Sequence, residues 1–388
     1  MTTHDGTSPP NVLPRADTLH LSSRGTRIPS LDGIRAIAVL IVFIGHGTTD
    51  QGFWPGHLGV TIFFFLSGYL ITTLLRREYE KSKRIRLGRF YLRRALRILP
   101  AAYFTILLSL LLAATGVLPS AVDAWGVLAQ FLNITNYYLI INGSDGLPPE
   151  TSHLWTLAVE EQYYLVVPLV LLLAYRFGAG RLLIGRLVVA VALVVPVWRI
   201  ILGLNGADFD RIYSGTDTRV DAILWGTALA LLLNPVMGDS VRRPGKAARW
   251  ISSHLPLIAA VAAVIVVVSS VIPALAFELS VADTLQCIAL VPIFWFIITR
   301  PAGVVGRLLN SRIATRIGVL SFSIYLLHKM VLALVTPTMD APILTDAIAL
   351  VLSIMAAQIV YWAIERPFTK LRVRIEEHAV LRAQHQTS

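Results

Sequence analysis

The stretch at residues 30–50, SLDGIRAIAVLIVFIGHGTTD, decides the class of fold. Its middle is apolar over the length of a membrane-spanning helix, yet it carries Arg35 near its start and His46 near its end. Ionisable side chains within hydrocarbon are costly and usually functional. On an ideal helix the two residues lie about 16 Å apart along the axis and within about 20° of one face. One helix face is therefore expected to present a cation at one end and an imidazole at the other. The alternative is that Arg35 reaches the lipid headgroups and His46 is a packed polar residue.

The composition places the whole chain in the membrane class. Hydrophobic residues make up 55% of the 388 positions and charged residues only 15%, a bias that is not typical of a water-soluble domain. The formal net charge is +11, but the basic residues gather between apolar segments, which indicates membrane orientation rather than nucleic-acid binding. The single cysteine, Cys287, excludes a disulfide framework. Because no clustered set of metal ligands is visible, no metal site is expected.

Apolar runs near the length of a bilayer crossing predict an all-α, polytopic membrane helix bundle of about ten transmembrane helices. A further apolar segment at 122–141 is interrupted by polar residues. The basic loops all fall on one side only if this segment does not cross, so it is expected to be a re-entrant or interfacial helix on the outer side. Eleven spans is the alternative. The ten expected spans are residues 31–49, 57–75, 98–116, 157–175, 182–203, 219–233, 251–273, 281–299, 316–336 and 343–363.

The chain is expected to hold one membrane domain, residues 30–370. The segment 1–29 is polar and rich in Ser, Thr and Pro, which is typical of a disordered arm. The segment 371–388 is charged and is expected to be a tail. Because basic loops face the cytoplasm, arm and tail are both expected to be cytoplasmic, in a multi-pass protein of the cytoplasmic (inner) membrane.

Arginines gather at the predicted cytoplasmic end of the third span. Arg93 and Arg97, and likewise Arg94 and Arg97, are spaced by about one helical turn, so at least two guanidinium groups can converge on one anion. Together with Arg35 they fit a phosphorylated cytosolic ligand. Membrane anchoring and contact with anionic lipid are the alternative interpretation.

The outer half of the predicted bundle holds a second group of polar residues. Glu160 and Glu161 are expected at a depth comparable with His46, and only one of them can face a shared cavity because neighbours on a helix point about 100° apart. A carboxylate there would hold the imidazole and select its tautomer. Other residues at this depth are candidates for a substrate site or, alternatively, for structural bridges between helices. They are His153, Trp155, Asp217, Arg219, Asp221, Tyr325 and His328.

The order and spacing of these segments resemble the acyltransferase-3 family of integral membrane acyltransferases over about residues 28–370. One departure is Thr156, which stands where the family usually has a serine after the tryptophan. Many members carry a fused esterase-like domain, and this chain is expected to be a stand-alone member without one. The resemblance rests on LDGIRAIAVL with ten residues between Arg35 and His46, GVTIFFFLSGYLI, RRALRILP, HLWTLAVEEQYYLVVP, DTRVDAILWG, SFSIYLLH and ERP.

The resemblance implies an O-acyltransferase that uses acyl-CoA, most often acetyl-CoA, as co-substrate and a hydroxyl as acceptor. His46 would be the general base, oriented by Glu160 or Glu161, and the arginines would hold the donor. Direct transfer and a transient acyl-histidine both remain open. The acceptor could be a carbohydrate, a glycolipid or a macrolide-like natural product. A transporter or flippase of a glycan or small molecule is the alternative class, although no convincing internal repeat is visible.

Overall fold

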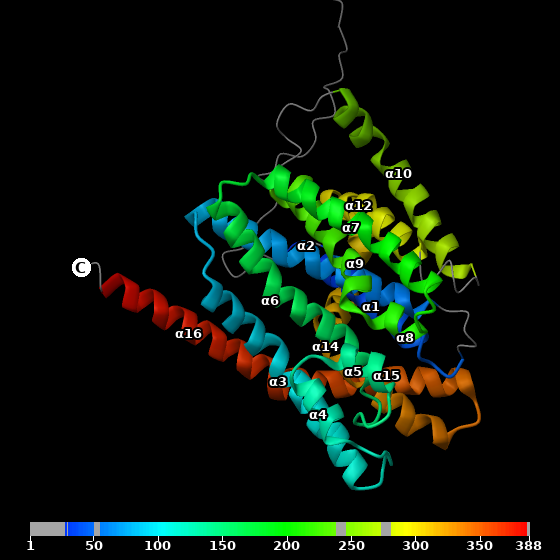
Figure 1. Ribbon diagram of the computed structural model, residues 1–388. Helices are drawn as coiled ribbons and strands as arrows, with labels where there is room; N and C mark the ends of the chain where they lie inside the picture. The colour runs from blue at the N-terminus through cyan, green and yellow to red at the C-terminus, as the bar shows by residue number, and fades with distance from the viewer. Residues whose placement is uncertain (1–27, 29, 50–54, 238–245, 273–280, 386–388) are drawn as a thin grey trace, which may run out of the picture.

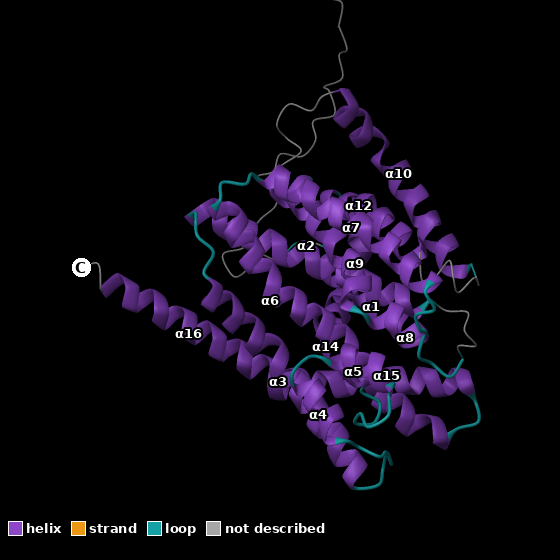
Figure 2. Cartoon of the chain, in the orientation of Figure 1, coloured by secondary structure: helices purple, strands orange, loops and turns teal. Residues whose placement is uncertain are grey.

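The computed structural model describes residues 28, 30–49, 55–237, 246–272 and 281–385. All regular structure within these ranges is helical, apart from one isolated bridge between Val122 and Gly146 (Figure 2). The predicted all-α fold is therefore confirmed. Of the expected arm at 1–29, only Ile28 lies within the described residues.

A helix covers most of each of the ten predicted spans, and the helices pack into a bundle (Figure 1). Within the described residues, eight helical segments are long and apolar enough to cross a membrane, and α1 and α12 are shorter apolar helices of 14 and 17 residues. The chain is a multi-pass membrane protein. The α-helices are α1 (Leu31–Ile44), α2 (Gly56–Ser82), α3 (Leu87–Ala114), α4 (Ala124–Phe131), α5 (Thr135–Asn142), α6 (Trp155–Arg176), α7 (Arg181–Leu204), α8 (Phe209–Ser214), α9 (Thr216–Leu232), α10 (Lys246–Val271), α12 (Asp283–Thr299), α13 (Val304–Leu309), α14 (Arg312–Val335), α15 (Pro342–Val360) and α16 (Arg366–His385).

The first helix is shorter than predicted. It ends at Ile44, so that His46 lies in a turn beyond the helix and not inside a span that continues to residue 49. The reason is a close contact at Gly45, where a Cβ atom would lie 2.5 Å from the Cα atom of Gly56. The end of α1 therefore packs directly against the start of α2.

The segment 122–141 forms α4 and α5, two helices of eight residues each. Each rises about 12 Å, which is too short to cross a bilayer. The polar residues that interrupt the apolar run tie the segment to its neighbours. Gln130 donates to the hydroxyl of Thr151 (2.6 Å), and Gln162 of α6 donates to the side-chain oxygen of Asn136 (3.0 Å). The predicted non-crossing helix is thus a pair of short helices.

Helix α2 lies at the centre of the bundle, packed against α1, α9 and α12. Gly59 faces the backbone of Ala38 in α1, and Gly68 faces the backbone of Ile223 in α9, each so closely that a Cβ atom would collide. Glycine at these two positions therefore permits close packing of α2 against α1 and α9. Ser67, in contrast, points into a cavity.

The C-terminal segment is a helix, α16, over its described part. A π-helical turn, Tyr361–Glu365, joins α15 to α16. Pro367 follows this turn, and a wider turn is the expected response because proline has no N–H to donate and its ring crowds the preceding turn of a regular α-helix. Helix α16 then runs beside α3 (Figure 1). It thereby becomes part of the wall of the cavity described next.

Candidate active site

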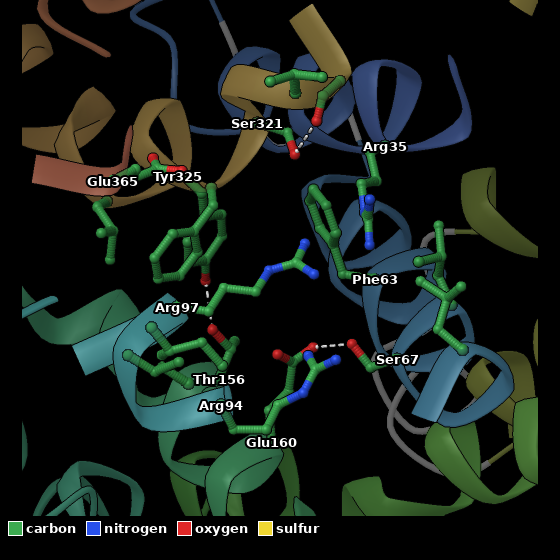
Figure 3. A pocket seen from close by; sticks show the side chains of 18 of the residues that line it. Arg35, Phe63, Ser67, Arg94, Arg97, Thr156, Glu160, Ser321, Tyr325 and Glu365 are labelled. Carbon is green, nitrogen blue, oxygen red and sulfur yellow. Dashed lines mark hydrogen bonds between the residues drawn. The ribbon is translucent and has the colours of Figure 1, made fainter. Parts of the chain in front are cut away.

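A cavity of about 350 Å³ lies between α1, α2, α3, α6, α14 and the C-terminal helices (Figure 3). Its wall combines apolar side chains with an unusual number of charged ones for a membrane helix bundle. Four arginines come from three different helices. The charged and hydroxyl-bearing residues of the wall are Asp32, Arg35, Ser67, Arg94, Arg97, Thr156, Glu160, Tyr164, Ser321, Tyr325, Tyr361, Glu365, Thr369 and Arg372.

The predicted convergence of arginines occurs, with one exception. Arg35 of α1 and Arg94 and Arg97 of α3 line the same cavity. Arg35 forms an ion pair with Asp32 (3.1 Å), and the guanidinium of Arg94 lies 5.4 Å from the ring centre of Tyr164. Among the described residues, Arg97 has neither a hydrogen bond nor an ion-pair partner. These groups are available to an anionic ligand.

Arg93 is the exception, because it faces away from the cavity. Its guanidinium lies 3.5 Å from the carboxylate of Glu78 and 3.8 Å from that of Glu376. Arg93 and Arg94 are adjacent on α3 and so point about 100° apart. Arg93 therefore forms ion pairs that join α3 to α2 and α16, and it does not line the cavity in which its role in ligand binding was expected.

Of the two adjacent glutamates, only Glu160 lines the cavity, as predicted from their spacing. Its carboxylate accepts hydrogen bonds from the hydroxyl groups of Ser67 (2.7 Å) and Tyr164 (3.2 Å). Glu161 does not line the cavity, and its Oε1 atom is buried without a hydrogen-bond partner in the described part of the chain. The Glu160 carboxylate thus lies in the same cavity as the arginines.

Tyr325 closes the other end of the cavity. Its hydroxyl lies 2.6 Å from the hydroxyl oxygen of Thr156 and donates to the backbone oxygen of His153 (3.0 Å). The ring centres of His153 and His328 lie 5.2 and 5.6 Å from that of Tyr325, and both imidazoles are buried. A single tyrosine therefore separates the arginine-lined cavity from a cluster of histidines.

His46 belongs to this histidine cluster. Its ring centre lies 5.0 Å from that of His328, and its Nδ1 atom is 2.9 Å from the backbone oxygen of Val42. The expected pairing with Glu160 or Glu161 differs from the structure, which places His328 against the His46 ring. The cause is depth, since Glu160 lies two helical turns, about 10 Å, beyond His153 along the chain.

Helices α1 and α14 set the distance between the arginines and the histidines. They pack side by side, with Gly318 against the backbone of Asp32 near one end and His328 against His46 at the other. Ten residues of α14 span about 15 Å. The arginine end of the cavity and the histidine cluster are therefore separated by about half the thickness of a bilayer core.

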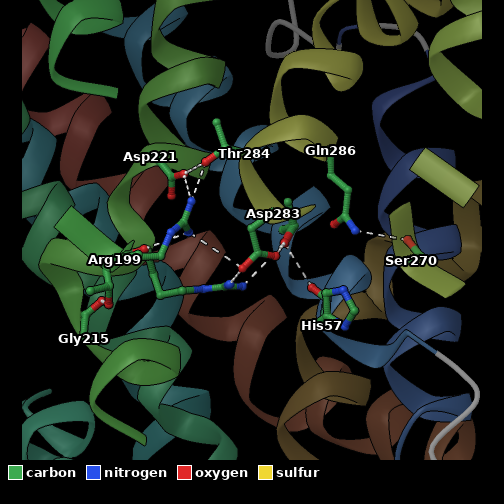
Figure 4. Close-up of polar contacts among 11 residues, drawn as sticks. His57, Arg199, Gly215, Asp221, Ser270, Asp283, Thr284 and Gln286 are labelled. Carbon is green, nitrogen blue, oxygen red and sulfur yellow. Dashed lines mark hydrogen bonds and ion pairs between the residues drawn. The ribbon is translucent and has the colours of Figure 1, made fainter. Parts of the chain in front are cut away.

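The remaining predicted substrate residues form bridges between helices, which was their alternative interpretation, and Figure 4 shows the bridge made by Asp221. Asp221 accepts from Arg199 of α7 (2.8 Å), and Arg219 pairs with Asp283 of α12. None of these residues lines the cavity. Three further contacts complete the set: Trp155 lies 6.0 Å from the Arg219 guanidinium, Asp217 accepts from Arg211 (2.9 Å), and Asp217 also accepts from Trp198 (2.7 Å).

Among the cavity residues that the sequence did not identify, three lie after the last predicted span, 343–363, and one of these, Arg372, lies in the segment expected to be a tail. Glu365, Thr369 and Arg372 all line the cavity, and Glu365 accepts a hydrogen bond from Ser323. Their spacing of four and three residues is the periodicity of one helix face. That periodicity was the signal that could have identified them.

Fold and site together define a multi-pass helical membrane protein with a charged cavity that ends beside a histidine cluster. The family model described as "Acyltransferase domain" matches residues 28–364. The chain therefore belongs to the acyltransferase-3 family, as its sequence motifs indicated.

Named relatives agree with this assignment. The peptidoglycan O-acetyltransferase OatA of Listeria monocytogenes is 32% identical over 326 residues, which cover 81% of this chain and 50% of that protein. A putative O-acetyltransferase of Staphylococcus aureus strain COL is 29% identical, with 88% of this chain and 57% of that protein covered. The putative peptidoglycan O-acetyltransferase YrhL of Bacillus subtilis is also 29% identical, with 90% and 56% covered. The chain thus spans about half the length of these relatives. No solved structure shows a significant match.

Proposed function

We propose that this protein is a membrane O-acyltransferase that moves an acyl group, most simply acetyl, from acyl-CoA to a hydroxyl of a glycan. One observation carries the proposal. A single cavity is lined by Arg35, Arg94 and Arg97 and ends at Tyr325, whose ring contacts the histidine cluster that holds His46. A site of this form accepts an anionic donor at one end and delivers its reactive group towards a base at the other.

The arginines are proposed to hold the phosphates of the donor. Arginine binds phosphate oxygens through paired, charge-assisted hydrogen bonds. Arg94 and Arg97 follow the most basic loop of the chain, which the positive-inside rule assigns to the cytoplasm. The donor therefore enters from the cytosol, both termini face the cytoplasm, and the protein resides in the inner membrane. The thioester extends from there towards Tyr325.

His46 is proposed to act as the general base. A carbonyl oxygen only accepts hydrogen bonds, so the contact between Nδ1 and the backbone of Val42 (2.9 Å) assigns the ring proton to Nδ1 and the lone pair to Nε2. Nε2 removes the proton of the acceptor hydroxyl while the oxygen attacks the thioester carbonyl. The carbon–sulfur bond breaks, and the leaving CoA thiolate takes the proton from Nε2. Direct transfer of this kind accounts for the proton and the leaving group without an acyl-enzyme intermediate.

The acceptor is proposed to be a cell-envelope glycan reached from the outer face. His46 lies beyond the end of α1 and is exposed, which suits a large acceptor. The relatives from Listeria and Bacillus are named for peptidoglycan O-acetylation. Peptidoglycan strands are therefore the first acceptor to test.

The test uses the full chain in lipid nanodiscs with acetyl-CoA and soluble peptidoglycan strands. Release of free CoA thiol and the mass of the glycan are followed together. We expect His46→Ala to lower CoA release by at least about 10²-fold, the usual contribution of a general base, with binding of CoA retained. His254→Ala on α10 is the matched control and should behave as wild type. Acetyl transfer by His46→Ala at the wild-type rate would contradict the proposed mechanism.

A further inference from the structure

His328 is a buried histidine of α14 that the proposed reaction does not yet use. It is 1% exposed, and its Nε2 atom lies 3.4 Å from Nδ1 of His46. The two rings meet edge to face, at an angle of 64°. His328 therefore contacts the edge of the proposed base that carries Nδ1.

The hydrogen bonds of the two rings fix a single arrangement of protons. Nδ1 of His328 lies 2.6 Å from the backbone oxygen of Tyr325, so Nδ1 carries the proton and Nε2 of the neutral ring is an acceptor. Nδ1 of His46 also carries its proton, because it faces the Val42 carbonyl. The lone pair of His328 therefore lies 3.4 Å from Nδ1 of His46, so the single N–H of that atom is shared between the Val42 carbonyl and His328. The lone pair of His46 is left on Nε2, the atom that the proposed mechanism requires.

We propose that His328 is the positioning residue of His46 and occupies the place that a carboxylate takes in many catalytic histidine pairs. This inference rests on the proposed function. When Nε2 of His46 takes the acceptor proton, the ring becomes an imidazolium and its Nδ1–H becomes a stronger donor. Nε2 of His328 shares that stronger bond with the Val42 carbonyl, and no proton passes to His328. The CoA thiolate then removes the proton from Nε2 of His46 and restores the resting pair.

The surroundings of His328 favour a neutral ring. The His153 ring, from the turn before α6, lies 5.1 Å away, and Tyr325 lies on the cavity side. The neighbouring Lys329 is engaged by Glu150 (3.5 Å) and by the hydroxyl of Ser152 (3.1 Å). A second positive charge at His328 would meet the His46 imidazolium without a paired carboxylate. A neutral acceptor avoids that cost.

Two isosteric amides separate the roles of the two ring nitrogens. In His328→Asn the amide occupies the position of Nδ1, so it keeps the bond to the Tyr325 carbonyl but does not reach His46. In His328→Gln the amide oxygen takes the position of Nε2 and can accept from His46. We expect the asparagine variant to lose about 10- to 100-fold in kcat, as is usual for the orienting partner of a histidine. The glutamine variant should recover at least tenfold of that loss.

Two readouts and a control variant keep this test distinct from the test of the proposed function. The KM for acetyl-CoA and the melting temperature should be unchanged in both variants, because His328 does not line the donor cavity. His254→Gln is the control for the substitution itself. If wild type transfers acetyl and His46→Ala does not, equal activity of the asparagine and glutamine variants would overturn the inference, and so would full activity of the asparagine variant. Absence of transfer by wild type would overturn the proposed function on which the inference rests.

Discussion

Arg93 and Arg97 lie one turn apart on α3 and face different surroundings, which makes them a matched pair for testing the donor site. Arg97 lines the cavity, whereas Arg93 is engaged by Glu78 and Glu376. A charge-assisted hydrogen bond contributes about 1.5–3 kcal/mol, which is about 10- to 100-fold in affinity. We expect Arg97→Ala to raise the Kd of CoA by this factor, measured by isothermal titration calorimetry.

Arg93→Ala is the control for Arg97→Ala. It should change the Kd of CoA less than threefold, because its ion pairs are partly exposed and such pairs contribute little. A larger effect of Arg93→Ala than of Arg97→Ala would contradict the assignment of the donor site. The comparison holds total charge constant, so it separates a direct contact from a general field of positive charge.

At the C-terminal end of α1, the turn that carries His46 is held by a residue almost three hundred positions away. Asp346, in the first turns of α15, accepts hydrogen bonds from the backbone and hydroxyl groups of Thr48 and Thr49, at 2.6–3.0 Å. His46 lies outside the regular helix, so its backbone position depends on this clamp. We expect Asp346→Ala to lower kcat about tenfold with an unchanged KM for acetyl-CoA.

The steady-state kinetics of Asp346→Ala are best compared with those of Asp340→Ala. Asp340 is an exposed carboxylate in the connector before α15, so its removal tests the loss of charge alone and should leave kcat unchanged. A rise in KM with an unchanged kcat in the Asp346 variant would contradict a role in placing His46.

The helices could be predicted almost completely from the sequence, and their ends could not. A crossing helix must satisfy its backbone within one apolar segment, so the signal is local. The end of α1 at Ile44 depends instead on contact between Gly45 and Gly56. Helix α16 was missed because it is charged, and no apolar run marks it.

The candidate site could be predicted only in part, because its parts come together through tertiary packing. Spacing on α3 identified Arg94 and Arg97, but choosing between Arg93 and Arg94 requires the direction of the cavity. The pairing of His46 with His328 depends on the relative depth of α1, α6 and α14, which no single helix encodes. A carboxylate is the usual expectation for the partner of a histidine such as His46. In the structure Glu160 lies about two helical turns beyond His153, away from the histidine cluster.

The packing of the whole bundle involves a buried network of charges that the cavity does not use. Arg199 of α7 pairs with Asp221 of α9 (2.8 Å) and lies 3.8 Å from Asp283 of α12, and each of these side chains is at most 6% exposed. Removing one partner leaves a buried charge uncompensated, which costs about 3–5 kcal/mol.

We expect Asp221→Ala to lower the melting temperature of the whole protein sharply, measured by nanoscale differential scanning fluorimetry in detergent. Asp217→Ala, which removes a carboxylate that is 42% exposed, should shift it little. Equal melting temperatures for the two variants would show that the buried network does not stabilise the bundle. If Asp221→Ala loses acetyl transfer but keeps its stability, Asp221 would instead be assigned to the acceptor site.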